Sequence, residues 1–393
     1  MTSKETIVKD KIDAFPVPQP DAGWSREMIT VENATIWPAG PMKRVPTCGV
    51  TYPDGRDCPE AAIYRGDTRM MAAVDTSNRA EPTAQLTGKH LWGGQVFAHF
   101  GHFLTETIPR LWAVENSDAE SLVFIGKHEG LRAFSPWQQR FLDLLGVDMP
   151  ITFISEPTRV EHLIVPGQGF GLGRIAHGTP EFRSFIGRLQ GTIAANGAEK
   201  IYISRTKTGK KGRVLNEFSL EQNLIAQGYV AFHPQEHSLE DQLAQYKAAS
   251  HVIGLDSSAF HLLALVARPE QRIAVILRRN MMAYINIERQ LAGMLGRSPD
   301  IINMLVGDWM PPRQKKANRE SWGQIDHQKL VARLTELGYL NKPEAWAYPN
   351  DKDFQIAYEK LRKRMGGEIV FRPAEVPIED IIAGGTAPPA PST

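Results

Sequence analysis

The sequence contains little cysteine, and nothing in the surroundings of its cysteines suggests a metal site. Its 393 residues include two cysteines, Cys48 and Cys58, and no paired Cys and His pattern surrounds them. The sequence leaves open whether the two cysteines form a disulfide that closes the short loop between them. We expect two free thiols, because that is the ordinary state of cysteine in a reducing cytoplasm.

Long apolar runs are also missing. No stretch approaches the ~18–20 apolar residues that a membrane span needs. The first 30 residues carry Lys4, Lys9, Asp10, Lys11 and Asp13 in place of the apolar core of a signal peptide. We therefore expect a soluble, cytoplasmic protein with no transmembrane segment, while peripheral membrane association stays open.

An excess of charge of either sign is absent. The 45 basic and 44 acidic side chains leave a formal net charge of +1. Such a balance creates no field that would attract a polyanion, so nucleic acid is not an expected partner. Local basic clusters therefore have to be interpreted as individual sites. The sequence carries no signal for the oligomeric state.

Three common motifs are lacking as well: the dinucleotide fingerprint Gly-x-Gly-x-x-Gly, the Walker phosphate loop and the zinc motif His-Glu-x-x-His. The only Asp-x-Asp triplet, Asp351 to Asp353, precedes a predicted helix and is more typical of a helix cap than of a metal site. We therefore predict no required metal or other cofactor.

What is present is a pattern of short apolar strands and capped helices, which is clearest after residue 200. Strands alternating with helices of this length predict an α/β fold with a parallel sheet and right-handed crossovers, that is, a Rossmann-like domain. The chain length allows about two domains. The predicted strands of the second domain are 201–204, 229–233, 251–255 and 272–277. Four helices are predicted to begin at the caps Ser135, Thr179, Ser219 and Ser238.

The predicted domain organisation has five parts. They are an N-terminal arm with short strands (1–60), a first Rossmann-like domain (61–197), a second one (198–310), C-terminal helices packing back on the first domain (311–381) and a tail disordered by composition (382–393).

One constellation of polar residues lies before the first clear strand. On a helix, His99, His102 and Glu106 fall within about 60° of one another, and Arg110 joins them if Pro109 only kinks the helix. Such a stripe is normally apolar or uniformly solvated. A carboxylate beside imidazoles can accept a proton from a hydroxyl, so Glu106 is a candidate general base. The alternative is a solvated helix face.

A basic loop follows the strand at 201–204. The carboxyl ends of parallel strands form the edge at which α/β sheets bind ligands, and Arg makes bidentate bonds to phosphate oxygens. We expect an anion-binding loop here, with a solvated basic turn as the alternative. Its cationic residues are Arg205, Lys207, Lys210, Lys211 and Arg213.

A third candidate follows the strand at 251–255. Asp256, Ser257 and Ser258 come directly before an apolar helix, whose free N–H groups could hold a diphosphate. Gly254 would let a ligand approach the backbone closely. Simple capping of the helix by Asp256 or Ser257 is the alternative.

These three segments resemble motifs of glycosyltransferase family 61, which includes extracellular O-GlcNAc transferase, plant xylan xylosyl- and arabinosyltransferases and many bacterial polysaccharide enzymes. The first motif is similar to His102 through Glu106 followed by Pro109, Arg110 and Leu111. The second is similar to Tyr202, Ser204, Arg205, Arg213, Asn216 and Glu217. The third is similar to Gly254, Asp256, Ser258, Ala259 and His261, with Asp256 and Ser257 standing where the family commonly has His and Gly.

The resemblance implies a GT-B architecture, in which two Rossmann-like domains face a central cleft. It also implies an inverting, metal-independent transfer from a nucleotide sugar, which we expect to be UDP-linked, to a glycan hydroxyl in surface polysaccharide biosynthesis. In this hypothesis Glu106 is the base, His102 or His99 orients it, and Arg110 lines the acceptor side or the cleft. The donor diphosphate is held by Arg205, Lys211, Arg213, Asn216, Gly254, Asp256, Ser257, Ser258 and His261.

Two other functions stay open at this point. A polysaccharide pyruvyltransferase would also need an arginine-rich anion site, but it would respond to phosphoenolpyruvate. A non-catalytic glycan-binding protein would respond to no nucleotide.

Overall fold

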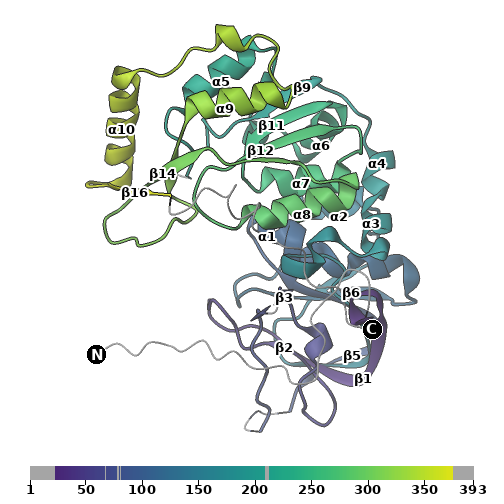
Figure 1. Ribbon diagram of the computed structural model, residues 1–393. Coiled ribbons are helices and arrows are strands. Elements are labelled where there is room, and N and C mark those ends of the chain that lie inside the picture. The colour runs from purple at the N-terminus through teal and green to yellow at the C-terminus, as the bar shows by residue number, and fades with distance from the viewer. Residues whose placement is uncertain (1–22, 67, 78, 80, 209–211, 375–393) are drawn as a thin grey trace, which may run out of the picture. The chain divides into compact units, whose positions relative to one another are not determined.

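The computed structural model describes residues 23–66, 68–77, 79, 81–208 and 212–374. The chain forms two compact units (Figure 1). Unit 1 comprises Met1–Ala194 with Ala264–Val266, and unit 2 comprises Ala195–Leu263 with Ala267–Thr393.

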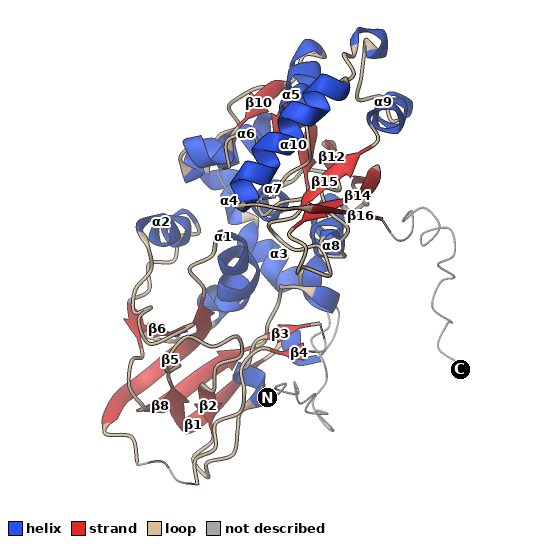
Figure 2. Ribbon diagram, turned by 90° about the vertical axis from the view of Figure 1, so that its left-hand side faces the viewer, coloured by secondary structure: helices blue, strands red, loops and turns tan. Residues whose placement is uncertain are grey.

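The main sheet of unit 1 is mixed. Its strand order is β2-β1-β8-β5-β6-β7, in which β1 is antiparallel to both of its neighbours and the last four strands are parallel (Figure 2). The strands are β1 (Met28–Trp37), β2 (Gly49–Thr51), β5 (Ala84–Val96), β6 (Ser121–Gly126), β7 (Ile151–Phe153) and β8 (Thr158–Pro166). A separate pair is formed by β3 (Tyr64–Arg65) and β4 (Thr68–Arg69).

The predicted N-terminal arm is a part of this sheet. Strand β1 pairs with β2 on one side and along most of its length with β8 on the other. Val31, Ala34 and Ile36 on β1 are buried in the core of unit 1. The described part of the segment, residues 23–60, therefore folds with unit 1 instead of standing apart. Residues 1–22 lie outside the described residues.

Strand β5 is the long central strand that the sequence pattern did not predict. Its first half alternates in burial, but its second half, from His90 to Val96, is buried throughout. Glycines and polar residues interrupt that half, and the register shifts between Trp92 and Gly94. Because a period-two pattern needs an uninterrupted register, the strand carries no recognisable alternation.

The helical segments of unit 1 begin where the predicted caps stand. Gln138 and Ser135 form a capping box at α2, and the Thr179 side chain accepts a hydrogen bond from the Phe182 N–H at α3. Gly187 divides the predicted helix after Thr179 into α3 and α4. The segments are η1 (Gly23–Arg26), η2 (Pro59–Ala61), α1 (Phe100–His102), η3 (Phe103–Thr107), η4 (Ile108–Asn116), α2 (Pro136–Leu144), η5 (Gly173–His177), α3 (Pro180–Ile186) and α4 (Arg188–Thr192).

Unit 2 contains a five-stranded, fully parallel sheet of order β10-β9-β11-β12-β13, as the strand–helix alternation predicts. Its strands are β9 (Lys200–Ile203), β10 (Val230–Phe232), β11 (His251–Leu255), β12 (Arg272–Ile276) and β13 (Asp300–Ile302). Its helical segments are α5 (Glu217–Ala226), η6 (Pro234–Glu236), α6 (Leu239–Ala248), α7 (Ala259–Val266) and α8 (Tyr284–Leu295).

The predicted caps of unit 2 were partly wrong. Ser238 caps α6 by accepting from the Asp241 N–H, as expected. Helix α5 begins two residues before the predicted Ser219, because Asn216 takes a left-handed conformation with φ 59° and starts the helix there.

The described part of the C-terminal segment folds with unit 2, and the packing of its helices on the first domain stays a prediction. It contains a small antiparallel sheet of order β15-β14-β16 and the helices α9 and α10, and its described residues cluster with unit 2. Leu330, Val331 and Leu334 of α9 are buried in the same core as Tyr202 and Ile253 of the parallel sheet. The segments are β14 (Leu305–Met310), β15 (Trp322–Ile325), α9 (His327–Glu336), η7 (Pro343–Ala345), α10 (Asp351–Met365) and β16 (Val370–Pro373).

Each apolar helix face of the C-terminal segment packs against a neighbouring element of unit 2. Helix α9 completes the core of the parallel sheet, while Leu361 of α10 packs with Trp322 of the small sheet. The Asp-x-Asp triplet is a cap, as predicted, since Asn350 and Asp353 form a capping box at α10.

Cys48 and Cys58 are both free and buried, as expected. Burial raises the pKa of each thiol to about 12, which keeps both protonated and unreactive at neutral pH. Within the part of the chain that the structure describes, no helix is both long enough and apolar enough to cross a membrane.

Replacing Leu330 with Ala tests the placement of α9. We expect the free energy of unfolding to fall by about 2–5 kcal/mol, because the side chain is fully buried in the core of unit 2. Urea unfolding followed by circular dichroism measures the change. The exposed Gln328 on the same helix provides the control, and Gln328→Ala should change stability by less than about 0.5 kcal/mol. Equal effects of the two substitutions would contradict this packing.

Candidate active site

His102 and Glu106 form a hydrogen-bonded pair in unit 1. His102 ends the short helix α1, and Glu106 lies four residues later in η3, which is a π-helical turn of a kind often found at functional sites. The Nδ1 atom of His102 lies 2.5 Å from Oε2 of Glu106. The Glu106 side chain is 0% exposed, whereas that of His102 is 38% exposed. The imidazole is therefore the member of the pair that solvent or a substrate can reach.

Arg65 is the third member of this group, and the sequence analysis missed it. It lies on β3, and its guanidinium donates from Nε to Oε1 and from Nη2 to Oε2 of Glu106, the latter over 2.8 Å. Both carboxylate oxygens are thus bound by one arginine in the bidentate geometry of a strong ion pair. A buried carboxylate signals that such a partner exists, but no spacing in the sequence identifies which arginine supplies it.

These contacts decide the charge of Glu106. Burial raises the pKa of its carboxyl, but the hydrogen bonds from His102 and Arg65 and the charge of Arg65 outweigh burial and leave the pKa below its ordinary value. An ionised carboxylate only accepts hydrogen bonds, so the shared proton is on Nδ1 of His102. In the neutral imidazole the lone pair is then on Nε2, which is the atom able to accept a proton.

His99 contacts the ring of His102. It precedes α1 in an extended conformation, and the centroids of the two imidazole rings are 5.1 Å apart. The Phe97 ring lies 5.7 Å from His102. The three polar residues therefore come together as predicted, but through a ring contact and one hydrogen bond instead of a regular helix face.

Arg110 does not belong to this group, contrary to our expectation that it lines the acceptor side. It is 2% exposed, and its guanidinium donates to three backbone carbonyl groups, those of Glu60, Ala62 and Pro166. Burial lowers its pKa to about 10. The physical reason is that the chain continues after η3 as a 3₁₀ helix, which turns each side chain by about 120° and directs Arg110 into the core.

In unit 2, charged residues gather at the carboxyl edge of the parallel sheet. Arg205 follows β9, Asp256 follows β11, and Arg278 with Arg279 follows β12. These three strands are neighbours, since β11 pairs with both of the others. Burial and then the charge of Arg278 lower the pKa of Arg205 to about 10, so the arginines are close enough to repel one another. The group of Arg205, Arg278 and Arg279 is called the cationic rim below.

The sequence analysis missed Arg278 and Arg279, although the rule that selected Arg205 applies to them. Both follow directly on the predicted strand 272–277, at the edge where α/β sheets bind ligands. Burial lowers the pKa of Arg279 to about 10, and repulsion by Arg278 adds to that effect.

Asp256 holds the cationic rim together. Its Oδ1 accepts from the Arg278 N–H over 2.8 Å, and the Arg278 Nε donates to its backbone carbonyl over 2.8 Å. Its Oδ2 lies 3.6 Å from Nε of Arg279. A buried carboxylate bound in this way repels a phosphate, so Asp256 is placed to position the arginines rather than to contact a diphosphate as we expected.

The predicted basic loop folds onto itself. Arg205 donates from Nε to the Gly212 carbonyl over 3.0 Å, and Arg213 donates to the Thr206 carbonyl over 2.6 Å. The guanidinium of Arg213 also stacks 4.4 Å from the centre of the Trp322 ring. Lys211 and Lys210 lie outside the described residues. Contacts within the protein therefore hold the side chains of Arg205 and Arg213 in fixed orientations.

Glu217 holds the start of this loop through hydrogen bonds. Its Oε1 accepts from the Arg205 N–H over 2.6 Å and from the Tyr202 hydroxyl over 3.2 Å. Burial raises the pKa of Glu217 to about 7, although both hydrogen bonds and the charges of Arg205 and Arg213 oppose the increase. Asn216 provides the left-handed start of α5, and its Nδ2 has no hydrogen-bond partner among the described residues.

The remaining predicted donor residues surround the start of α7. Close packing favours glycine at 254, because a Cβ there would lie 3.0 Å from both Ile203 Cβ and Phe260 Cζ. The approach of a ligand at this glycine stays a prediction. His261 shares a hydrogen bond of 2.5 Å with Gln290 Oε1. Ser257 and Ser258 are half-buried and precede the helix, as predicted.

No three His, Cys, Asp or Glu side chains gather in a way that could hold a metal ion within the described ranges.

Glu217→Gln tests the buried carboxyl through pH. The folded-state pKa of about 7 lies above the ordinary value of a glutamate, so the folded protein binds more protons than the unfolded chain between these two values. This contribution to stability is present at low pH and is lost as the pH rises through 7. We expect the unfolding free energy of the wild type, relative to the variant, to fall by on the order of 2 kcal/mol from pH 5 to pH 8. A difference that urea unfolding shows to be independent of pH would refute the assignment.

The comparison with known protein families fits this geometry. The family model for glycosyltransferase 61 matches residues 100–274, a span that contains His102, Glu106, Arg205 and Asp256. None of the curated proteins compared with the chain matches it. Arg65, Arg278 and Arg279 lie outside the matched span, so they come from the structure alone. Residues 100–274 are therefore a glycosyltransferase family 61 domain, and the chain is a glycosyltransferase.

Proposed function

We propose that the enzyme transfers a sugar from a nucleotide-sugar donor, which is UDP-linked, to a glycan hydroxyl with inversion at the anomeric carbon. We further propose a GT-B architecture, a cytoplasmic location and a role in surface polysaccharide biosynthesis. The observation that carries the proposal is the cationic rim of Arg205, Arg278 and Arg279 at the carboxyl edge of the parallel sheet. The family assignment favours glycosyl transfer over a pyruvyltransferase or a non-catalytic binding protein.

The cationic rim is suited to the leaving diphosphate. As the bond from the anomeric carbon to the diphosphate oxygen breaks, its electron pair stays on that oxygen and negative charge grows there. Fixed positive groups stabilise this charge without reorganising, which is the largest contribution in many enzymes. Asp256 and Glu217 hold the arginines in place before the substrate binds. The positive charge of this rim stabilises the leaving diphosphate as a divalent metal would, so the proposal includes no metal.

The proton of the attacking hydroxyl goes, in our proposal, to Nε2 of His102. Glu106, which the sequence motif suggested as the base, has a fully buried side chain and both oxygens bound by Arg65. It acts through the imidazole, because its carboxylate fixes the Nδ1 proton and stabilises the imidazolium that forms. The acceptor oxygen then bonds to the anomeric carbon on the face opposite to the departing diphosphate.

His102→Ala should lower the rate of sugar transfer by about 10²–10⁴-fold, because the proton acceptor is lost. Glu106→Gln keeps the shape of the pair but removes the charge that stabilises the imidazolium, and we expect a loss of about 10²-fold or more. Initial rates with saturating donor and acceptor measure both effects.

His99→Ala is the matched control for this pair, since it removes an imidazole that contacts the ring of His102. Its effect should be at least ten times smaller than that of His102→Ala. Near-normal turnover by folded His102→Ala protein would assign the proton to another group, and an equal loss in His99→Ala would show that the ring cluster acts only structurally.

Arg205→Ala and Arg279→Ala should each weaken binding of uridine diphosphate by about 10–100-fold, the value expected for a charge-assisted hydrogen bond to phosphate. Isothermal titration measures the affinity. Arg333→Ala serves as the control, because Arg333 lies on α9 and pairs only with the exposed Glu336 among the described residues. Unchanged affinity in both rim variants would remove the diphosphate from this edge of the sheet. A panel of other nucleoside diphosphates identifies the base.

A further inference from the structure

Helix α10 has two chemically different faces. Phe354, Tyr358, Leu361 and Met365 pack towards the small sheet around Trp322, and Leu361 is fully buried. The opposite face is exposed, and its C-terminal half carries cationic side chains. A helix of this kind, apolar on one side and basic on the other, normally needs its polar face only for solubility. The exposed face of α10 also carries an apolar side chain, which solubility does not require.

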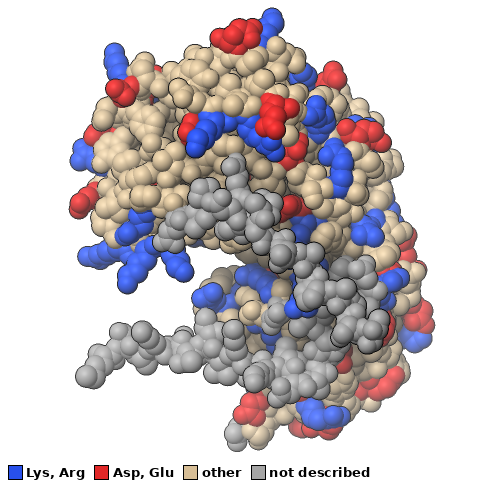
Figure 3. All heavy atoms as spheres, in the orientation of Figure 1, with Lys and Arg blue, Asp and Glu red and all other residues tan. Residues whose placement is uncertain are grey.

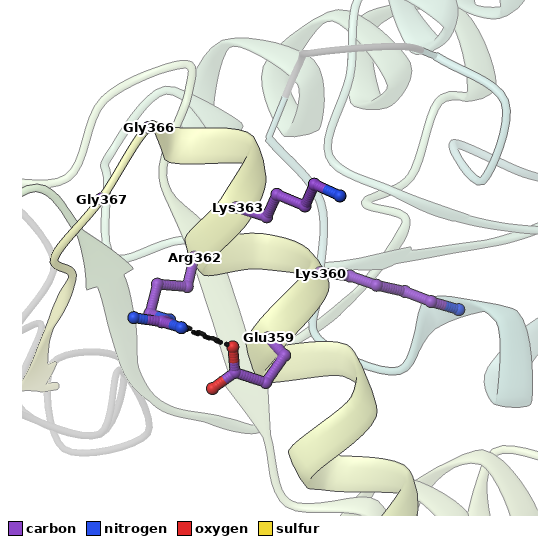
Figure 4. A pocket seen from close by; sticks show the side chains of 6 residues that line it. All are labelled: Glu359, Lys360, Arg362, Lys363, Gly366 and Gly367. Atoms are coloured by element: carbon purple, nitrogen blue, oxygen red, sulfur yellow. Dashed lines mark hydrogen bonds and ion pairs between the residues drawn. The ribbon is translucent and has the colours of Figure 1, made fainter.

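The exposed stripe consists of Ile356, Lys360 and Lys363, which lie within about 60° of one another around the helix axis. Lys360 and Lys363 extend from one side of the helix, while Arg362 turns to Glu359, with which it forms an ion pair of 2.9 Å (Figure 4). Ile356 is 46% exposed, one turn before Lys360. The stripe thus combines cations with an apolar side chain that unit 2 leaves in water.

A basic loop lies near the C-terminal end of α10, because Met310, directly before the loop, pairs with Val370, which follows the helix. Residues 311–320 contain four basic side chains and one acidic one, and the basic ones are all exposed. Arg372 of β16 ties this loop to the strand that follows α10, since it donates to the carbonyl groups of Gln314 and Pro312. Lys and Arg side chains gather on this side of unit 2, on the left of Figure 3. The exposed basic residues of α10's C-terminal half and of this loop are Arg313, Lys315, Lys316, Arg319, Lys360, Arg362 and Lys363.

A hollow on the surface lies within this basic area. It is bordered by the last two turns of α10 and by Gly366 and Gly367, which end the helix (Figure 4). Gly366 has φ 79° and closes the helix in the left-handed conformation. A Cβ at either glycine would meet no atom within 4 Å, so the space beside both glycines is open.

We propose that this face, formed by the exposed side of α10 and the loop 311–320, binds the surface of an anionic lipid bilayer. Clustered lysines and arginines on an amphipathic helix are attracted to acidic lipid headgroups, and each contributes about 1 kcal/mol near the surface. The exposed Ile356 between the lysines favours a bilayer over a soluble polyanion, because an apolar side chain gains by entering the boundary between headgroups and acyl chains. The chain as a whole has a charge of only +1, so the positive charge is local.

Sedimentation with vesicles tests this face on the full-length protein. Vesicles of phosphatidylcholine alone should bind little protein, and vesicles with one third phosphatidylglycerol should bind it at low salt and release it at high salt. Lys360→Gln with Lys363→Gln should reduce the partition coefficient about 20-fold, and Ile356→Ser should reduce it further. Sugar transfer to a soluble acceptor should stay unchanged, because these residues lie outside the proposed site.

The matched control removes two exposed lysines elsewhere on unit 2, in Lys329→Gln with Lys342→Gln. Equal loss of vesicle binding in the control would reduce the effect to net charge and overturn the proposal. It would also be overturned by failure of the wild type to bind anionic vesicles, or by stronger binding to a soluble anionic polysaccharide with no effect of Ile356→Ser. None of these results depends on the sugar-transfer chemistry, since vesicle binding requires no turnover.

Discussion

The buried carboxylate of Glu106 is the constraint on which the candidate active site depends. Removing such a group from water costs several kcal/mol, and the cost is offset only if both oxygens are paired. Arg65 pairs with both oxygens, and His102 shares one of them. The arrangement fixes the tautomer of the imidazole and leaves the lone pair on Nε2. In our proposal, the carboxylate that the sequence motif suggests as the base is therefore the residue that orients the base.

Unit 2, in contrast, brings positive charges close together at the carboxyl edge of its parallel sheet. Burial lowers the pKa of Arg205 and Arg279, and the charge of Arg278 lowers both further. Asp256 and Glu217 offset this cost through hydrogen bonds to the backbone and guanidinium groups. Charged groups with shifted pKa values concentrate at functional sites, so this arrangement is consistent with a site that binds an anion.

Much of the fold could be predicted wherever local chemistry decides it. Ser135, Thr179, Ser238 and Asn350 start helices where capping rules place them, and the parallel sheet of unit 2 follows from strand–helix alternation. The long strand β5 could not be predicted, because its bulge breaks the period on which such a prediction depends. Nor could the packing of α9, since an amphipathic helix shows that it needs an apolar surface without showing which one.

The sequence by itself determined the residue types, their order and their edge of the sheet: a His and a Glu four apart, and an Arg after a buried strand. Only the tertiary structure decided which side chains meet. It brought Arg65 to Glu106, placed Arg278 beside Asp256 and sent Arg110 into the core. The reason is that spacing along one helix or strand is fixed by backbone geometry, whereas the partner of a buried charge comes from a distant segment and is selected by packing and by the cost of leaving that charge unpaired.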